Sequence, residues 1–316
     1  MPATYRPRFR FRIGSLLAAA GLLIGLAACG SAAPTSSSTA HPIRLYDDMH
    51  HLVVLKHPAR RLVVLEPSNF EIVDALGLRH DIVGVDTSVP GYTPAPWAKA
   101  ARGLPSVGPS FPGISVERIV ARRPDLVLAM TGIAGLKGLS TLHIPVLVLN
   151  PQSINGVYRD ITLVGEATGT ESRAEALVRR MKGEVAALTR QVARTSKRPL
   201  VFYDLGGLYT TGQHTFLDSL IQMAGGRNVG AELSTAQWPQ VTDEQVVHAN
   251  PSIIMVDPDA TTVAKERQIP GFLETRAGRS GHIVAVANSS YINEPSLGLV
   301  AGLRELIKIL HPGLLK

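Results

Sequence analysis

Two glutamates occupy matching positions in a unit that this 316-residue chain uses twice. The unit reads SVERIVARRPDLVLAM over residues 115–130 and TDEQVVHANPSIIMVD over residues 242–257, and the copies align without a gap. Glu117 and Glu244 each stand two residues after a hydroxyl residue suited to cap a helix. A carboxylate there favours the helix through its dipole. A repeat without a gap that includes the glutamate also suggests two lobes of similar design.

The rest of each unit predicts its local structure. Gln245 follows Thr242 by three residues, which is the spacing of a capping box. Pro124 and Pro251 cannot continue the preceding helix, and each is followed by a mostly apolar run typical of a strand buried on both faces. We therefore expect two lobes of similar design, each with a capped helix that leads into a buried strand.

The first 29 residues are typical of a secretion signal. Four arginines precede an apolar stretch over residues 13–28, which is short for a membrane span. The stretch ends in Leu-Ala-Ala-Cys29, which resembles the lipobox of bacterial lipoproteins, where the cysteine is lipidated. Cys29 is the only cysteine, so an internal disulfide is excluded and lipidation is favoured over a signal that contains a cysteine by chance. Residues 30–42, rich in Ser, Thr, Ala and Pro, predict a flexible tether. We expect an extracytoplasmic protein, lipid-anchored to the cell membrane.

Composition and motifs exclude several functions. The formal charge of +7 falls to +3 without the four leader arginines, and no basic stripe with interleaved aromatics supports nucleic-acid binding. The chain contains no Gly-x-Ser-x-Gly, His-Glu-x-x-His or phosphate-loop motif. We therefore expect that the protein is not an enzyme and has no catalytic residue, metal site or cofactor.

Strands alternate with helices in two stretches, residues 43–155 and 198–316, which predicts two Rossmann-like α/β lobes with mainly parallel sheets. In the first lobe we expect strands at residues 61–65, 81–85 and 144–149, a turn at 66–69, a helix at 70–77 and a long loop at 87–104. Ligands of such sheets bind beyond the carboxyl ends of the strands, which here carry residues 66–69, the Tyr92 loop and residues 130–133.

Residues 156–197 predict a helical connector. A first helix covers residues 156–169, and a longer one begins at residue 171 and spans roughly 37 Å. Its apolar positions follow helical spacing on one face: 174, 177, 178, 181, 185, 188 and 192. We expect a rigid strut between the lobes, with Gly183 marking either close packing or a bend.

Four blocks, residues 61–85, 107–128, 208–228 and 238–254, resemble the periplasmic-binding-protein family that delivers ferric siderophores, haem or cobalamin to ABC importers. The segment WPQVTDEQVV, which begins at Trp238, is especially similar to vitamin B12-binding members. The resemblance implies two lobes joined by one long rigid helix, a ligand cleft between them and little lobe closure. It implies that Glu117 and Glu244 dock onto arginines of a permease dimer, with the binding protein itself a monomer.

The resemblance also implies ligand contacts. In B12-binding members aromatic side chains at the strand ends line the cleft, which points to Trp238 directly. Other candidates lie in corresponding loops or strand ends, with Met130 replacing an aromatic of the family: Tyr92, Phe111, Met130 and Tyr209. Each could instead be packed in the core or a loop. Residues 291–298 lack the arginine that many relatives carry there, which disfavours a strongly anionic siderophore.

We therefore expect a substrate-binding lipoprotein of an ABC importer that captures a large metal chelate. Cobalamin is favoured slightly over a neutral or weakly charged ferric siderophore. The alternatives are a haem carrier with Met130 or a tyrosine as axial ligand, a metal-ion-binding lipoprotein, and an extracytoplasmic enzyme. The ten histidines form no spaced set, and a surface adhesin would not need the paired glutamates.

Overall fold

The computed structural model describes residues 41–92 and 97–315, with the side chain of Tyr92 left out. The leader, Cys29 and nearly all of the predicted tether lie outside the described residues. Among the helices of the described part, none is long and apolar enough to cross a membrane.

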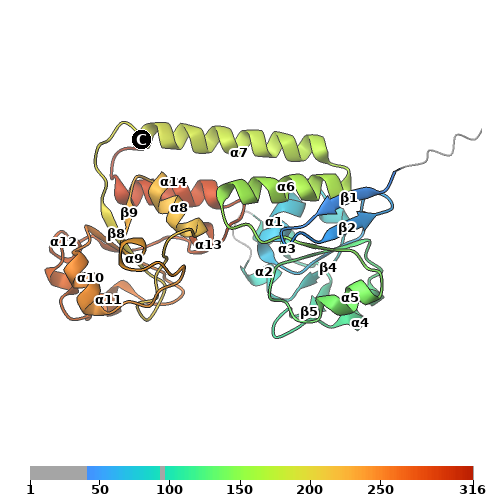
Figure 1. The fold of residues 1–316 in the computed structure, drawn as a ribbon, viewed down its shortest axis with the longest axis horizontal. Helices are drawn as coiled ribbons and strands as arrows, with labels where there is room; N and C mark the ends of the chain where they lie inside the picture. The colour runs from blue at the N-terminus through green and yellow to red at the C-terminus, as the bar shows by residue number, and fades with distance from the viewer. Residues whose placement is uncertain (1–40, 93–96, 316) are drawn as a thin grey trace, which may run out of the picture. The chain divides into compact units, whose positions relative to one another are not determined.

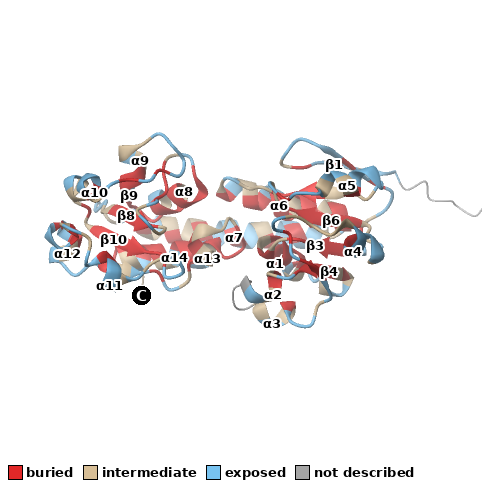
Figure 2. Cartoon of the chain, turned by 90° about the horizontal axis from the view of Figure 1, so that it is seen from below, coloured by how far each residue is buried: buried red, intermediate tan, exposed pale blue. Residues whose placement is uncertain are grey.

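Five parallel strands form the first sheet, in the order β5-β4-β3-β6-β7. They are β3 (Leu62–Val64), β4 (Ile82–Asp86), β5 (Ser106–Gly108), β6 (Leu126–Ala129) and β7 (Val146–Val148). The central strands β3 and β6 are buried along their whole length, as Figure 2 shows in red. Burial on both faces explains why these segments are continuous apolar runs in the sequence.

The helices of this lobe differ from the predicted ones in two places. The observed helices are α1 (Pro67–Ala75), the 3-10 turn η1 (Arg79–Asp81), α2 (Val89–Tyr92), α3 (Ala98–Ala101), α4 (Val116–Ala121) and α5 (Leu136–Thr141). The turn predicted at residues 66–69 is wrong, because Pro67 occupies the first position of α1, where its fixed φ suits a helix and its missing N–H leaves no bond unmade. The loop predicted at residues 87–104 contains the short helices α2 and α3.

A two-stranded antiparallel hairpin precedes the first sheet, and the sequence analysis did not assign it. It consists of β1 (Ile43–Tyr46) and β2 (Leu52–Leu55). The Asp48 N–H donates to the Val148 carbonyl at 3.1 Å, which ties the hairpin to the end of β7.

Four parallel strands form the second sheet, in the order β11-β10-β8-β9. They are β8 (Leu200–Asp204), β9 (Arg227–Asn228), β10 (Ile253–Val256) and β11 (Ile283–Ala285). The surrounding helices are α8 (Phe216–Met223), α9 (Val229–Leu233), α10 (Asp243–Ala249), α11 (Val263–Glu266), η2 (Phe272–Glu274), α12 (Arg276–Arg279), α13 (Ser290–Asn293) and α14 (Leu299–Leu310). The predicted parallel sheets are thus confirmed in both lobes.

The connector consists of α6 (Ile154–Thr168) and the long helix α7 (Glu171–Val192), which packs against α6 and α14 (Figure 1). Six of the seven predicted apolar positions of α7 are buried: Ala174, Leu177, Met181, Val185, Leu188 and Val192. They belong to one buried apolar cluster that also contains Leu62 of the first sheet and Val201 of the second. The two lobes and α7 therefore share one core.

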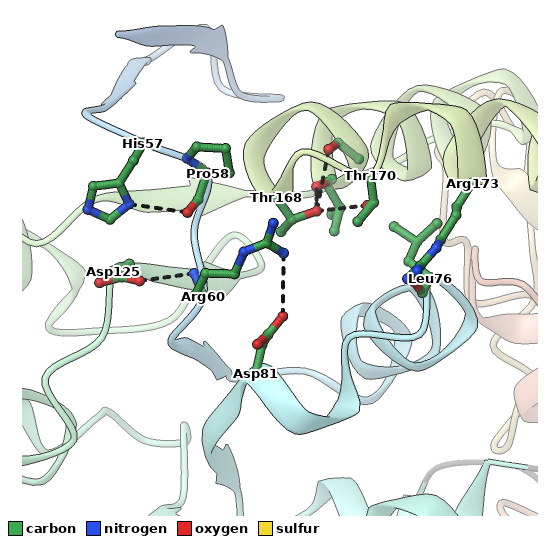
Figure 3. Close-up of polar contacts among 11 residues, drawn as sticks. His57, Pro58, Arg60, Leu76, Asp81, Asp125, Thr168, Thr170 and Arg173 are labelled. Carbon is green, nitrogen blue, oxygen red and sulfur yellow. Dashed lines mark hydrogen bonds and ion pairs between the residues drawn. The ribbon is translucent and has the colours of Figure 1, made fainter. Parts of the chain in front are cut away.

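Polar contacts fix the start of α7 on the first lobe (Figure 3). Arg173 Nη1 donates to the Leu76 carbonyl at the end of α1, at 2.9 Å. The hydroxyls of Thr168 and Thr170 lie 2.9 Å apart in the turn between α6 and α7. These contacts hold the turn against α1 and so set the direction in which α7 leaves the lobe.

Two glycines of the connector differ in their surroundings. A Cβ added at Gly165 of α6 would lie 2.5 Å from the Cβ of Ala174, so α6 and α7 approach closely there. Around Gly183 no atom lies within 4 Å of the added Cβ, and α7 continues through it as α-helix. Close packing is therefore the role of Gly165 and not of Gly183.

Gly183→Ala is expected to raise the free energy of unfolding by about 0.5–1 kcal/mol, because alanine restricts the unfolded chain and meets nothing in the folded one. Gly165→Ala is the matched variant and should lower it by about 1–3 kcal/mol through overpacking. Urea unfolding followed by circular dichroism measures both. A loss of stability in Gly183→Ala would show that this position is packed after all.

Candidate functional site

Trp238 is presented by a loop that pairs with a second loop. The Thr210 N–H donates to the Pro239 carbonyl at 2.9 Å, and the Gly212 N–H donates to the Gln237 carbonyl at 2.7 Å. A side chain at position 212 would not fit, since its Cβ would lie 1.9 Å from the Ala236 oxygen. The backbone on both sides of Trp238 is thus fixed while its side chain remains 54% exposed.

Trp238 lines a cavity of about 220 Å³ to which both lobes contribute. The first lobe provides Glu66, Met130 and residues 149–152, which follow the carboxyl ends of β3, β6 and β7. The second lobe provides Trp238, residues 215–216 and residues 293–295. This is the location that parallel sheets give to their ligands. Among the described residues that line it, none is Lys, Arg or His.

Carboxyl groups gather at this cavity. Glu66 and Glu294 line it from opposite lobes, and Glu71 of α1 is completely buried nearby. Burial, with the charges of Glu294 and Asp86, raises the pKa of Glu66 to about 7. Burial alone raises the pKa of Glu294 to about 7. At neutral pH these side chains are therefore partly protonated, and each can donate or accept a hydrogen bond.

Glu71 reaches from the first lobe to the segment before α14. Burial raises the pKa of Glu71 to about 8, which hydrogen bonding by Ser296 partly offsets. Burial is the larger of the two effects, so Glu71 is mostly protonated at physiological pH.

The predicted ligand residues have different places in the structure. Met130 and Trp238 both line the cavity. Phe111 and Tyr209 are 59% and 49% exposed and do not line it. Tyr92 is the last residue of α2, and the structure does not describe its side chain.

Sequence reasoning missed several lining residues. Residues 149–152 follow β7 and could have been inferred from the rule that ligands bind at strand ends. Residues 293–295 and the helix start at Thr215 are brought in by tertiary packing, and no sequence motif marked them as cavity-lining.

The two repeated glutamates each lie in the first turn of a helix that is capped by a hydroxyl residue. The Ser115 hydroxyl caps α4 by accepting from the Arg118 N–H at 3.3 Å and donates to Glu117 Oε2 at 3.0 Å. Thr242 and Gln245 form the predicted capping box of α10, with bonds of 2.9 and 3.2 Å. Hydrogen bonds from its own backbone N–H and from the Ser115 hydroxyl lower the pKa of Glu117. Hydrogen bonds from the Thr242 hydroxyl and from its own backbone N–H lower the pKa of Glu244. Both carboxylates are fully exposed and ionised.

No group of three or more His, Cys, Asp or Glu side chains within residues 41–92 and 97–315 is arranged to hold a metal ion.

A sequence model of the periplasmic binding protein family matches residues 62–289, which is well over half of the chain. The chain belongs to this family. It is 31% identical over 319 residues to the Bacillus subtilis (strain 168) protein named uncharacterized ABC transporter substrate-binding lipoprotein YvrC, with 96% of this chain and 97% of that one covered. A Halobacterium salinarum cobalamin-binding protein is 30% identical over 292 residues, covering 88% of this chain and 77% of that one.

Solved structures of periplasmic binding proteins share the fold. The haem-binding protein RhuT from Roseiflexus sp. RS-1, in apo form, aligns with a TM-score of 0.68 and 26% identity over 80% of this chain and all of that one. The expected two-lobed α/β fold is confirmed, and the family places this periplasmic binding protein outside the cytoplasm.

The free energy of unfolding should fall by about 1–3 kcal/mol between pH 5 and pH 8. Glu71 holds its proton in the folded protein up to a pKa of about 8 but in the unfolded chain only to 4.5, so the folded state binds more protons in this window. Glu71→Gln is expected to make the pH dependence less steep, with Glu66 and Glu294 supplying the slope that remains, measured by urea unfolding at each pH. The exposed Glu184→Gln is the control, and an equally steep slope in Glu71→Gln would contradict the assignment.

Proposed function

We propose that the protein is a lipid-anchored substrate-binding protein of an ABC importer, which captures a metal chelate in the cavity between its lobes and delivers it to a permease. The observation that carries this is the cavity itself, which lies at the carboxyl ends of strands in both lobes and contains Trp238 and Met130. Family membership supplies the general role, and Cys29 with its lipobox-like context supplies the anchor. The protein performs no chemical step.

The charge of the cavity favours chelates that carry amide or other N–H donors over chelates that carry carboxylates. Glu66 and Glu294 can accept such donors, whereas a carboxylate would find no cationic side chain among the described lining residues. Cobalamin, whose corrin ring bears amide side chains, fits this pattern better than a strongly anionic ferric siderophore. The cobalamin-binding relative also favours cobalamin over a ferric siderophore as the ligand.

The size of the cavity limits how a chelate can bind. Small-molecule sites usually measure about 300–1,000 Å³, and 220 Å³ accommodates only one edge of a large chelate. The remainder would lie against the exposed face of Trp238 at the cavity mouth. Because the lobes share one core through α7, we expect binding with little lobe closure.

Haem is the second candidate. Met130 lines the cavity and offers a thioether as axial ligand, and a haem-binding protein is among the similar structures. The two propionates of haem would lie close to the carboxyl groups of the cavity and be repelled by them. Haem is therefore a less favoured ligand than cobalamin.

Titration of the chain from Gly30 onward with cobalamin, haem and a panel of ferric siderophores should show saturable binding of one neutral chelate by calorimetry. Trp238→Ala is expected to weaken this binding at least tenfold, because aromatic surface is lost from the cavity. Tyr46→Ala removes another exposed aromatic side chain, from the hairpin, and should bind normally. A Soret band on purification would instead indicate haem, and no binding of any chelate would refute the proposal.

The paired glutamates are proposed to dock onto cationic pockets of a permease dimer, one from each lobe of a monomer. Their matched caps, full exposure and lowered pKa values keep two negative charges at equivalent positions. Exposed charges of this kind contribute modestly to affinity but direct encounter and register.

Combined Glu117→Lys and Glu244→Lys should abolish chelate uptake in cells while leaving chelate affinity in solution within about threefold, because the substitutions place like charges against the permease. Uptake of labelled chelate and calorimetry give the two readouts. The control reverses the charge of two glutamates that are exposed on α7, Glu175→Lys and Glu184→Lys, and should leave uptake intact. Normal uptake by the first variant would eliminate the docking role.

A further inference from the structure

A second hollow lies at the amino ends of the strands of the second sheet. It has a volume of about 770 Å³, and its lining includes Leu200 of β8, Arg227 of β9, Ile253 of β10 and His282, which directly precedes β11. All four strands are parallel, so this hollow is at the edge opposite the one that carries the ligand cavity. We call it the basic groove.

The groove is rich in cations that lack carboxylate partners. Its lining contains Lys197, Arg198, Arg227 and Arg276, with Glu232 as its one carboxylate. Arg227 pairs with Glu232 at 2.8 Å. No carboxylate oxygen of the described residues lies within 4.0 Å of the charged nitrogens of the other three side chains, which are exposed. Arg198 Nη1 donates only to the carbonyls of Thr195 and Lys197, each at 2.8 Å.

This positive charge contrasts with the lobe around it. Residues 197–316, which include all four groove cations, contain ten Lys and Arg against eleven Asp and Glu, a formal charge of −1. Acidic residues gather at the other edge, where Asp204 ends β8, Asp257 follows β10 and Glu244 lies in the first turn of α10. Burial, together with the positive charges of Arg198 and Lys197, lowers the pKa of His311 next to the groove. The lobe is thus polarised, with its positive end at the groove.

The rest of the groove is mainly apolar, apart from Asn250, Ser252 and His282. Leu200, Ile253, Ile309, Leu310, Pro199 and Pro312 contribute to its lining. Guanidinium groups bind phosphate oxygens through paired N–H donors, and apolar walls accept methylene groups. The combination suits an amphiphilic anion that carries a phosphate.

We propose that the basic groove binds the headgroups of anionic phospholipids and holds the second lobe on the membrane surface when the protein is not docked to its permease. The proposal depends on the lipid anchoring proposed above, since the thirteen residues 30–42 reach at most about 45 Å and keep the folded part near the bilayer. Because Glu244 lies at the opposite edge, membrane contact through the groove and permease contact through Glu244 exclude each other. Phospholipid then competes with docking.

The test is co-sedimentation of the unlipidated chain from Gly30 onward, which includes every described residue, with vesicles. Vesicles of equal parts phosphatidylglycerol and phosphatidylcholine should bind the protein, and binding should fall as salt is added. Pure phosphatidylcholine vesicles should not bind it. Neutralising Lys197, Arg198 and Arg276 together to glutamine is expected to reduce binding at least tenfold.

The matched control neutralises three exposed cations of the first lobe, Lys56, Lys99 and Arg102, to glutamine and so has the same net charge. It should bind anionic vesicles within about threefold of the unchanged protein. Equal losses in both variants, or no binding to anionic vesicles, would overturn the proposal. Tighter binding of inorganic phosphate or of an acidic peptide than of vesicles would assign the groove to another anion and overturn it as well. Chelate affinity, measured on the groove variant, separates this outcome from a failure of the proposed transport function.

Discussion

The packing of α7 is the constraint on which the rest of the structure depends. Its buried face is continuous with the cores of both sheets, so neither lobe can move away without exposing apolar surface. Exposing even a few buried leucine or valine side chains costs about 1.5–3 kcal/mol each, which is large beside the stability of a whole domain. A cavity formed by side chains of both lobes is therefore largely set before a ligand arrives, as is the separation of Glu117 and Glu244.

A preformed cavity permits the burial of acids that would otherwise be unfavourable. Glu66, Glu71 and Glu294 lie where the lobes meet, and burial raises the pKa of each. The free energy of keeping these groups from water must come from packing elsewhere, and the shared core is the source available. Their partial neutrality also explains how three carboxyl groups can approach one another without a cation among the described residues around the cavity.

The sequence predicted features that depend on local spacing and failed where tertiary packing decides. The apolar period of α7 predicted its buried face, with only Val178 less buried than expected, and the Thr242–Gln245 spacing predicted a capping box that forms. The start of α1 was misplaced because Pro67 was taken for a turn residue although it suits the first position of a helix. Phe111 and Tyr209 were expected in the cleft because of their type and loop. Among the predicted residues whose side chains the structure describes, Met130 and Trp238 line the cavity, since loop direction is set by contacts distant in sequence.

The repeated unit shows how the same local solution can serve folding and recognition at once. In both copies a hydroxyl residue caps the helix two residues before the glutamate, and in the first copy the Ser115 hydroxyl also donates to the Glu117 carboxylate. A carboxylate held in this way is ionised and oriented without any partner, which reduces the conformational entropy lost when a partner binds. The position of each glutamate on its lobe then depends on where its helix begins. That start is fixed by a hydroxyl cap in each unit, so the two charges occupy matching positions on their helices.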